Sequence, residues 1–126
     1  MKSVHSPLHA GHSGQLELTA AELLPGFECP ERAEIVLSRI REIGLGPIVA
    51  PVAQTLDVAK RVHRPDYVDF LAEAWDLWAA SGRTGSALPF VWPTRGLRDD
   101  LRPEKITALL GYYSFDAGSA FVPGTW

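Results

Sequence analysis

The sequence contains a single cysteine, Cys29, and no long run of apolar residues. One cysteine excludes a disulfide within the chain, and a membrane span needs roughly 20 consecutive apolar residues. The first six residues also lack the apolar stretch of a secretory signal peptide. Together these absences favour a cytoplasmic protein that has no membrane partner.

Neither positive nor negative charge is in large excess. The formal net charge is -3 at pH 7, and the Lys and Arg residues form no basic block. A surface that binds nucleic acid usually shows such a block. We therefore expect no nucleic-acid partner.

The 126 residues suffice for one ordinary domain, and 46% of them are hydrophobic. Helical apolar periodicity follows Pro30 and ends at Gly44, which predicts a first helix. A second, shorter helix is expected over residues 55–62. A third is expected from Pro65 to about Ala80, because proline disfavours helical backbone at Arg64. Apolar residues cover two faces of this third helix, so it needs packing partners on more than one side.

A short apolar run at residues 47–51, bracketed by prolines, predicts a strand after the first helix. Val4 lies in a segment that could form another strand, whereas residues 6–25 are expected to be loop. A helix, a glycine turn and a β-branched run in succession are typical of an α/β sheet protein.

From Gly82 to about Ile106, glycines and prolines interrupt any regular period. So long an irregular segment is usually a functional or partner-contacting loop. It carries aromatic and arginine side chains, the types enriched in the cores of protein interfaces. These side chains are Phe90, Trp92, Arg95, Arg98 and Arg102.

No complete metal site can be read from the residues. His9 and His12 are close in sequence, but zinc normally needs three or four protein ligands and no neighbouring Cys or paired Asp completes a set. We interpret them as loop histidines, with a metal-binding role as the weaker alternative. Acidic residues also follow one strip of the third helix, and a solvated face is favoured there over a cation site.

Two further side chains have alternative interpretations. Cys29 could be a nucleophile at a helix N-terminus, but its possible base, His63, lies in another segment, and a small buried cysteine is favoured. Glu17 has apolar neighbours and could project into a site that binds a cationic ligand. On the local pattern alone, a surface carboxylate is favoured.

Segments in a fixed order resemble the acetylpolyamine amidohydrolases, which belong to the arginase–deacetylase superfamily together with the histone deacetylases. The matching segments are 15–18, 22–28, 32–35, 61–63, 67–71, 74–78, 91–93, 110–113 and 123–126. The resemblance implies zinc-dependent hydrolysis of the acetyl amide of polyamines or related small amines. In that reaction a metal-bound water attacks the carbonyl and a histidine pair transfers protons.

The family's tandem histidines, its Asp-x-His and Asp zinc ligands and its transition-state tyrosine all fall beyond the position of Trp126. No His-His, Asp-x-His or Gly-His-His sequence occurs in the chain. We therefore expect residues 1–126 to form the N-terminal part of such a deacetylase. The expected fold is α/β: an incomplete arginase–deacetylase fold with a few strands, flanking helices and a long loop. We assign no catalytic or metal-ligating residue, and we expect zinc in the parent enzyme alone.

The resemblance also implies roles for particular residues. Glu17 matches an acidic residue near the active-site mouth that favours cationic substrates. Two other acidic positions of polyamine-selective members fall on Thr107 and Gly118, so the chain departs from the family there, and we assign Asp116 as a partial substitute.

The loop at about 82–105 matches an insertion that mediates dimerisation and narrows the partner's active-site entrance. We therefore expect self-association through Phe90, Trp92, Arg95 and Arg98, and expect small acetylated amines to be substrates of the complete enzyme. A naturally short interaction or oligomerisation module derived from the family, without its chemistry, is the alternative.

Overall fold

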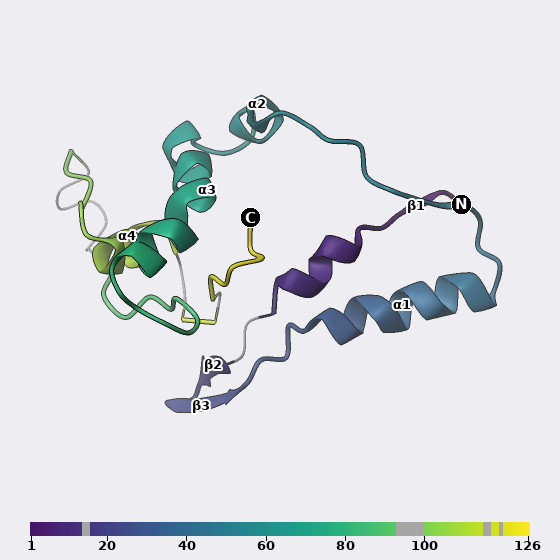
Figure 1. Cartoon of the computed structure of the whole chain (residues 1–126), viewed down its shortest axis with the longest axis horizontal. Coiled ribbons are helices and arrows are strands. Elements are labelled where there is room, and N and C mark those ends of the chain that lie inside the picture. Colours follow the sequence, from purple (N-terminus) through teal and green to yellow (C-terminus); the bar gives the residue numbers. More distant parts are fainter. Residues whose placement is uncertain (14–15, 93–99, 115–116, 119) are drawn as a thin grey trace.

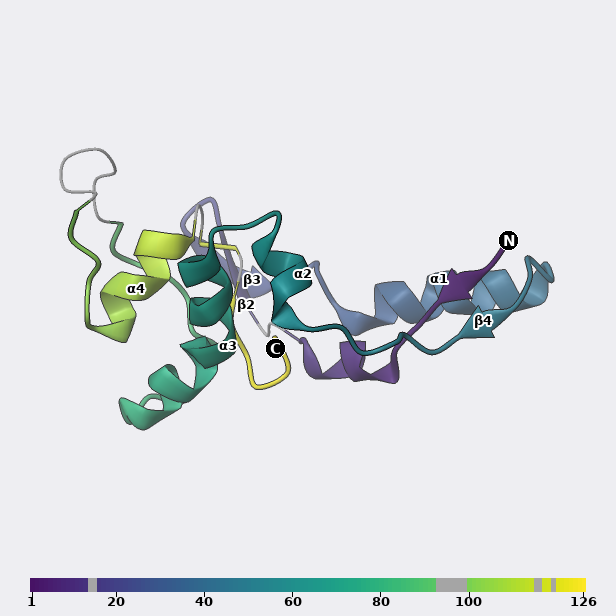
Figure 2. The same cartoon turned by 90° about the horizontal axis from the view of Figure 1, so that it is seen from above.

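The computed structural model describes residues 1–13, 16–92, 100–114, 117–118 and 120–126. The elements lie in two groups, which Figures 1 and 2 show at opposite ends of an elongated molecule. One group, here called the N-terminal arm, contains β1, η1, α1 and β4. The other, here called the helical lobe, contains α3 and α4. Within the described ranges, no helix is both long enough and apolar enough to cross a membrane.

The N-terminal arm is built on two short parallel strands. β1 (Ser3–Val4) pairs with β4 (Ile48–Val49), and α1 (Pro30–Glu42) lies between them in the sequence. The backbone N–H of His5 extends the pairing by donating to the carbonyl of Val49 at 3.0 Å. Parallel strands connected through a helix confirm the predicted α/β class.

The expectation that residues 6–25 form a loop is wrong. The segment contains the 3-10 helix η1 (Pro7–Gly11) and an antiparallel hairpin of β2 (Leu16–Thr19) and β3 (Glu22–Pro25). The hairpin turns at Ala20 and Ala21, whose φ angles are 50° and 68°. Such turns usually carry Asn or Gly, because these residues adopt positive φ at low cost. The two alanines give no such signal in the sequence.

Three predicted elements agree with the structure. α1 begins at Pro30, α2 (Leu56–Lys60) occupies part of the second predicted helix, and α3 (Pro65–Ala80) has the predicted bounds. The apolar face of α1 is less covered than its periodicity indicated. Leu37 is buried, but Val36 and Ile43 are 58% and 49% exposed. The described residues therefore leave much of this face open to solvent.

The core lies in the helical lobe, where α3 packs against α4 (Ile106–Tyr113). The ring of Phe70 stacks on Tyr113 with centroids 4.5 Å apart, and it meets Phe121 edge-on at 5.7 Å. Ala87 and Phe121 exchange two backbone hydrogen bonds, which bring the loop and the C-terminal segment onto the same core. The buried members are Phe70, Ala74, Trp78, Ala87, Ile106, Leu109, Leu110, Tyr113 and Phe121.

A polar chain along the edge of this core connects α3, α4 and the long loop. The hydroxyl of Tyr113 donates to Asp66 Oδ2 at 2.9 Å and accepts from Arg102 Nε at 2.9 Å. Arg64 also donates to both carboxylate oxygens of Asp66. Partial burial acts to raise the pKa of Asp66, but the hydrogen bonds from Arg64 and Tyr113 outweigh it and leave that pKa below its ordinary value.

We predict that Asp66→Asn lowers the free energy of unfolding by about 1 kcal/mol near neutral pH, because the partly exposed carboxylate loses charge-assisted hydrogen bonds. The lowered pKa of Asp66 means that its contribution is complete above roughly pH 4 and is lost as the pH falls through the folded-state value.

Urea denaturation at neutral and at acidic pH measures both effects. The difference between the wild type and Asp66→Asn should shrink in acid. Asp76→Asn, which changes an exposed carboxylate on the same helix, should behave like the wild type at both pH values. A difference of constant size down to acidic pH would contradict the assigned role of the carboxylate.

Candidate functional site

The β2–β3 hairpin places Glu17 at the wall of a cavity. Glu17 stands opposite Leu24 in the hairpin register, and its side chain is half-buried. Its Oε1 atom accepts a long hydrogen bond, 3.5 Å, from the backbone N–H of Glu28. The sequence pattern alone favoured a surface carboxylate, whereas the structure places Glu17 on the wall of a partly open cavity.

This cavity measures about 620 Å³, within the usual range for small-ligand sites. Its walls come from η1, the hairpin, the start of α1, one residue of α3 and the C-terminal segment. The lining residues are His9, His12, Leu16, Glu17, Glu28, Cys29, Pro30, Arg32, Ala33, Val36, Leu71, Gly118, Ala120, Phe121 and Thr125.

Among the residues that the structure describes, some of the charged side chains on the cavity wall are paired with each other, and Glu17 is not. Arg32, in the first turn of α1, forms an ion pair with Glu28, which precedes the helix, so these two charges offset each other. No ion pair joins Glu17 to another residue within the described ranges. Glu17 is therefore the carboxylate of this wall best placed to accept a cationic group from a ligand.

The C-terminal segment closes one side of the cavity against η1. His12 Nδ1 lies 3.0 Å from Thr125 Oγ1, and the backbone N–H of Val122 donates to the same oxygen at 2.9 Å. Gly124 packs so closely on the backbone of Gly11 that a Cβ atom would overlap it. The cavity therefore depends on contacts between the two ends of the chain.

The positions assigned by resemblance lie unevenly around this cavity. Gly118 lines it together with Glu17, and its lack of a side chain leaves that part of the wall without a carboxylate. Thr107 lies on α4 and is half-buried. Asp116, the assigned partial substitute, lies outside the described residues. Glu17 is thus the assigned substrate-binding residue that the structure places at the cavity.

The contacts of the histidines and of the cysteine differ from those that the sequence interpretation suggested. His9 and His12 have separate partners, since His9 Nδ1 lies 2.7 Å from the carbonyl of Ser6 and His12 contacts Thr125. His9 instead forms a cluster with His5 and Glu34, which the sequence analysis missed. Cys29 is half-buried on the cavity wall, not fully buried, while the ring of His63 contacts Tyr67.

The predicted dimerisation loop presents apolar side chains to solvent. Phe90 is 60% exposed and Trp92 45%, with Leu101 also exposed. Arg95 and Arg98 lie outside the described residues. Arg102 donates to Tyr113, which anchors the C-terminal end of the loop to the helical lobe. The loop thus combines a fixed base with an exposed apolar surface.

The chain was compared with family models, with characterised proteins and with solved structures. No family model matches the chain. The acetylpolyamine amidohydrolase 2 of Pseudomonas aeruginosa is 44% identical over 126 residues, which are 100% of this chain and 36% of that protein. The acetylpolyamine amidohydrolase of Mycoplana ramosa is 37% identical over all of this chain and 37% of its own length.

A crystal structure of acetylpolyamine aminohydrolase from Burkholderia pseudomallei superposes with a TM-score of 0.86 at 19% identity, over 100% of this chain and 36% of that one. At this identity the likeness supports the fold alone, and it confirms the expected partial α/β architecture. The chain spans about 36% of the length of the first relative and matches its N-terminal portion. The zinc-ligand motifs that the resemblance assigns to the family are absent from the sequence, so the residues present do not build that metal centre.

The base of the loop yields a prediction at Gly111 on α4. A Cβ atom on Gly111 would overlap the carbonyl of Val91 and lie 3.2 Å from Trp92 Cα, and both of these are backbone atoms. We expect Gly111→Ala to destabilise the protein by about 1–3 kcal/mol, measured by chemical denaturation, because the loop must move away from α4. Replacing glycine by alanine within a helix otherwise stabilises it by roughly 1 kcal/mol. A stabilised Gly111→Ala variant would therefore show that the loop does not pack there.

Proposed function

We propose that this chain, a homologue of the acetylpolyamine amidohydrolases over about 36% of their length, forms the N-terminal segment of a zinc-dependent deacetylase. In that role it supplies the cavity wall that carries Glu17, which forms part of a site for acetylated polyamines or related small amines. It does not hydrolyse the acetyl amide by itself, because its sequence lacks the family's zinc-ligand motifs. We accordingly assign no catalytic step to its residues.

The observation that carries this proposal is the position of Glu17 on the cavity wall. A half-buried carboxylate that is free of an ion pair with the described residues attracts a cationic amine more strongly than an exposed one, because less water screens the interaction. Leu16, Leu71 and Phe121 line the same cavity and offer apolar contacts for a carbon chain. A flexible chain that carries positive charge matches this combination of surfaces.

A chimaeric enzyme tests the proposal. We predict that the P. aeruginosa relative, with its 126 aligned residues replaced by this chain, hydrolyses an acetylated polyamine in the presence of zinc. Glu17→Gln in the chimaera should raise KM roughly tenfold and change kcat little, because a charge-assisted contact contributes on the order of 1–2 kcal/mol to binding.

Glu22→Gln is the matched control, since Glu22 lies exposed on the other strand of the same hairpin and should leave KM unchanged. The chain alone should show no hydrolysis above a zinc blank. A folded chimaera without activity, or equal effects of the two Glu→Gln substitutions, would contradict the proposal.

A second candidate function is supported by the exposed loop. In this alternative the chain is an interaction module, and its partner is a second copy of itself or a longer relative. Phe90, Val91, Trp92 and Leu101 are all at least 45% exposed. Clustered apolar surface of this kind is typical of protein contacts, in which aromatic side chains contribute most of the binding energy.

We predict that the chain self-associates in solution and that the double substitution Phe90→Ser and Trp92→Ser weakens the association at least tenfold. Loss of two aromatic side chains from an interface usually removes more than 1.4 kcal/mol of binding free energy. Sedimentation velocity over a concentration series measures the change. Val52→Ser, which removes a 79% exposed apolar side chain outside the loop, should have no effect. A monomer at every concentration would rule out a second copy of the chain as the partner.

A further inference from the structure

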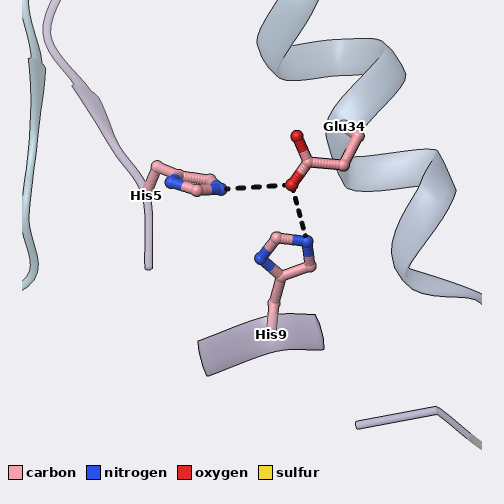
Figure 3. A group of neighbouring side chains, drawn as sticks. All are labelled: His5, His9 and Glu34. Carbon is pink, nitrogen blue, oxygen red and sulfur yellow. Dashed lines mark ion pairs between the residues drawn. The ribbon is translucent and has the colours of Figure 1, made fainter. Parts of the chain in front are cut away.

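Three side chains that could bind a metal ion converge in the N-terminal arm, and one of them, His9, also lines the Glu17 cavity. His5 follows β1, His9 lies in η1 and Glu34 lies in the second turn of α1. Figure 3 shows both imidazole rings directed at the same carboxylate oxygen. One ligand atom from each residue lies within 4.8 Å of the other two. The fold thus brings together residues that are 29 positions apart in the sequence.

The protonation of His9 follows from its other contact. Its Nδ1 lies 2.7 Å from the carbonyl of Ser6, and a carbonyl can only accept, so Nδ1 carries the hydrogen. In the neutral ring, Nε2 is then a bare lone pair. An Nδ1–H bond to a backbone carbonyl is also the usual arrangement by which proteins orient a metal-binding histidine.

This lone pair faces a negatively charged group. His9 Nε2 lies 3.1 Å from Glu34 Oε1, and His5 Nε2 lies 4.0 Å from the same oxygen. Both Nε2 atoms are shielded from solvent, and within the part of the chain that is described neither makes a hydrogen bond of acceptable geometry. Lone pairs directed at one another repel, so a cation between them, either a proton or a metal ion, stabilises the cluster.

The distances suit a transition-metal ion. In a tetrahedral zinc site the ligand atoms lie about 2.0–2.1 Å from the metal and therefore about 3.3 Å from one another. The observed separations of 3.1 Å and 4.0 Å bracket this value. The third separation, between the ligand atoms of His5 and His9, is no more than 4.8 Å, so the two imidazoles must approach each other for an ion to bind all three ligands. Two imidazoles and one carboxylate are a ligand set that zinc accepts, with a fourth position left for water.

We propose that His5, His9 and Glu34 bind one divalent transition-metal ion of the zinc type and thereby fasten β1 and η1 to α1. The site goes beyond the proposed function, because it uses none of the residues assigned there to substrate binding. The competing explanation is an ion pair between Glu34 and a protonated histidine, in which no metal takes part. The carboxylate of Glu34 is 55% exposed, so an ion can reach the cluster from solvent.

Titration calorimetry with zinc chloride tests the proposal on the full chain after dialysis against a chelator. We expect saturable binding near one equivalent. The variants His5→Phe and Glu34→Gln should each weaken it at least tenfold, because a three-ligand site that loses one ligand cannot hold the ion tightly. His63→Phe and Cys29→Ser should leave the affinity unchanged, since both residues lie outside the cluster. Circular dichroism of each variant verifies that it is folded.

Cobalt(II) substitution in the wild-type chain gives a second measurement that needs no variant. We expect the d–d bands of a tetrahedral site without a thiolate charge-transfer band, because the cluster contains no cysteine. The absence of saturable zinc binding would support the ion pair and overturn the proposal. So would binding that survives both His5→Phe and Glu34→Gln, or a thiolate band that identifies Cys29 as the ligand.

Discussion

The stacking of Phe70 on Tyr113 is the contact on which the helical lobe depends. It joins α3 to α4, and Phe121 packs edge-on against the same ring of Phe70. Phe121 in turn shares backbone hydrogen bonds with Ala87, so the loop and the C-terminal segment are both held by this one cluster. Aromatic pairs of this kind combine a large buried area with a preferred geometry, which makes them effective anchors.

The candidate cavity follows from that anchoring. Once Phe121 is fixed in the core, the residues after it return toward η1, where Thr125 meets His12 and Gly124 meets Gly11. The hairpin then supplies Glu17 from the opposite wall. An acidic, partly apolar cavity is thus formed by segments from the two ends of the chain, which explains why no single stretch of sequence describes it.

Much of the apolar surface remains uncovered by the residues that the structure describes. Val36 on α1, Ile43 just after its C-terminal end, and Phe90 and Trp92 on the loop are all at least 45% exposed. The relatives are nearly three times as long as this chain, and a partial fold exposes the faces on which further elements would pack. Exposed apolar area also favours association, which is the basis of the proposed interaction function.

Local sequence determined the elements whose signals are local. Pro30 and Pro65 mark the starts of α1 and α3, and apolar periodicity gives their lengths, because a helix depends on residues three and four positions apart. The ordered segments of the resemblance also gave the α/β class. α4 had a usable signal as well, since Ile106, Leu109, Leu110 and Tyr113 follow helical spacing, but the irregular residues before it obscured that pattern.

Tertiary structure alone decided the sites. The hairpin turns on two alanines at positive φ, and alanine in a sequence does not indicate this conformation. His5 and His9 meet Glu34 across the arm, and His12 meets Thr125 across 113 positions of sequence. Such contacts depend on where the whole backbone places each side chain, and these positions cannot be predicted from residue spacing. The sequence therefore determined the class of the protein and its family resemblance, and folding determined which carboxylate lines a cavity and which histidines face the same carboxylate.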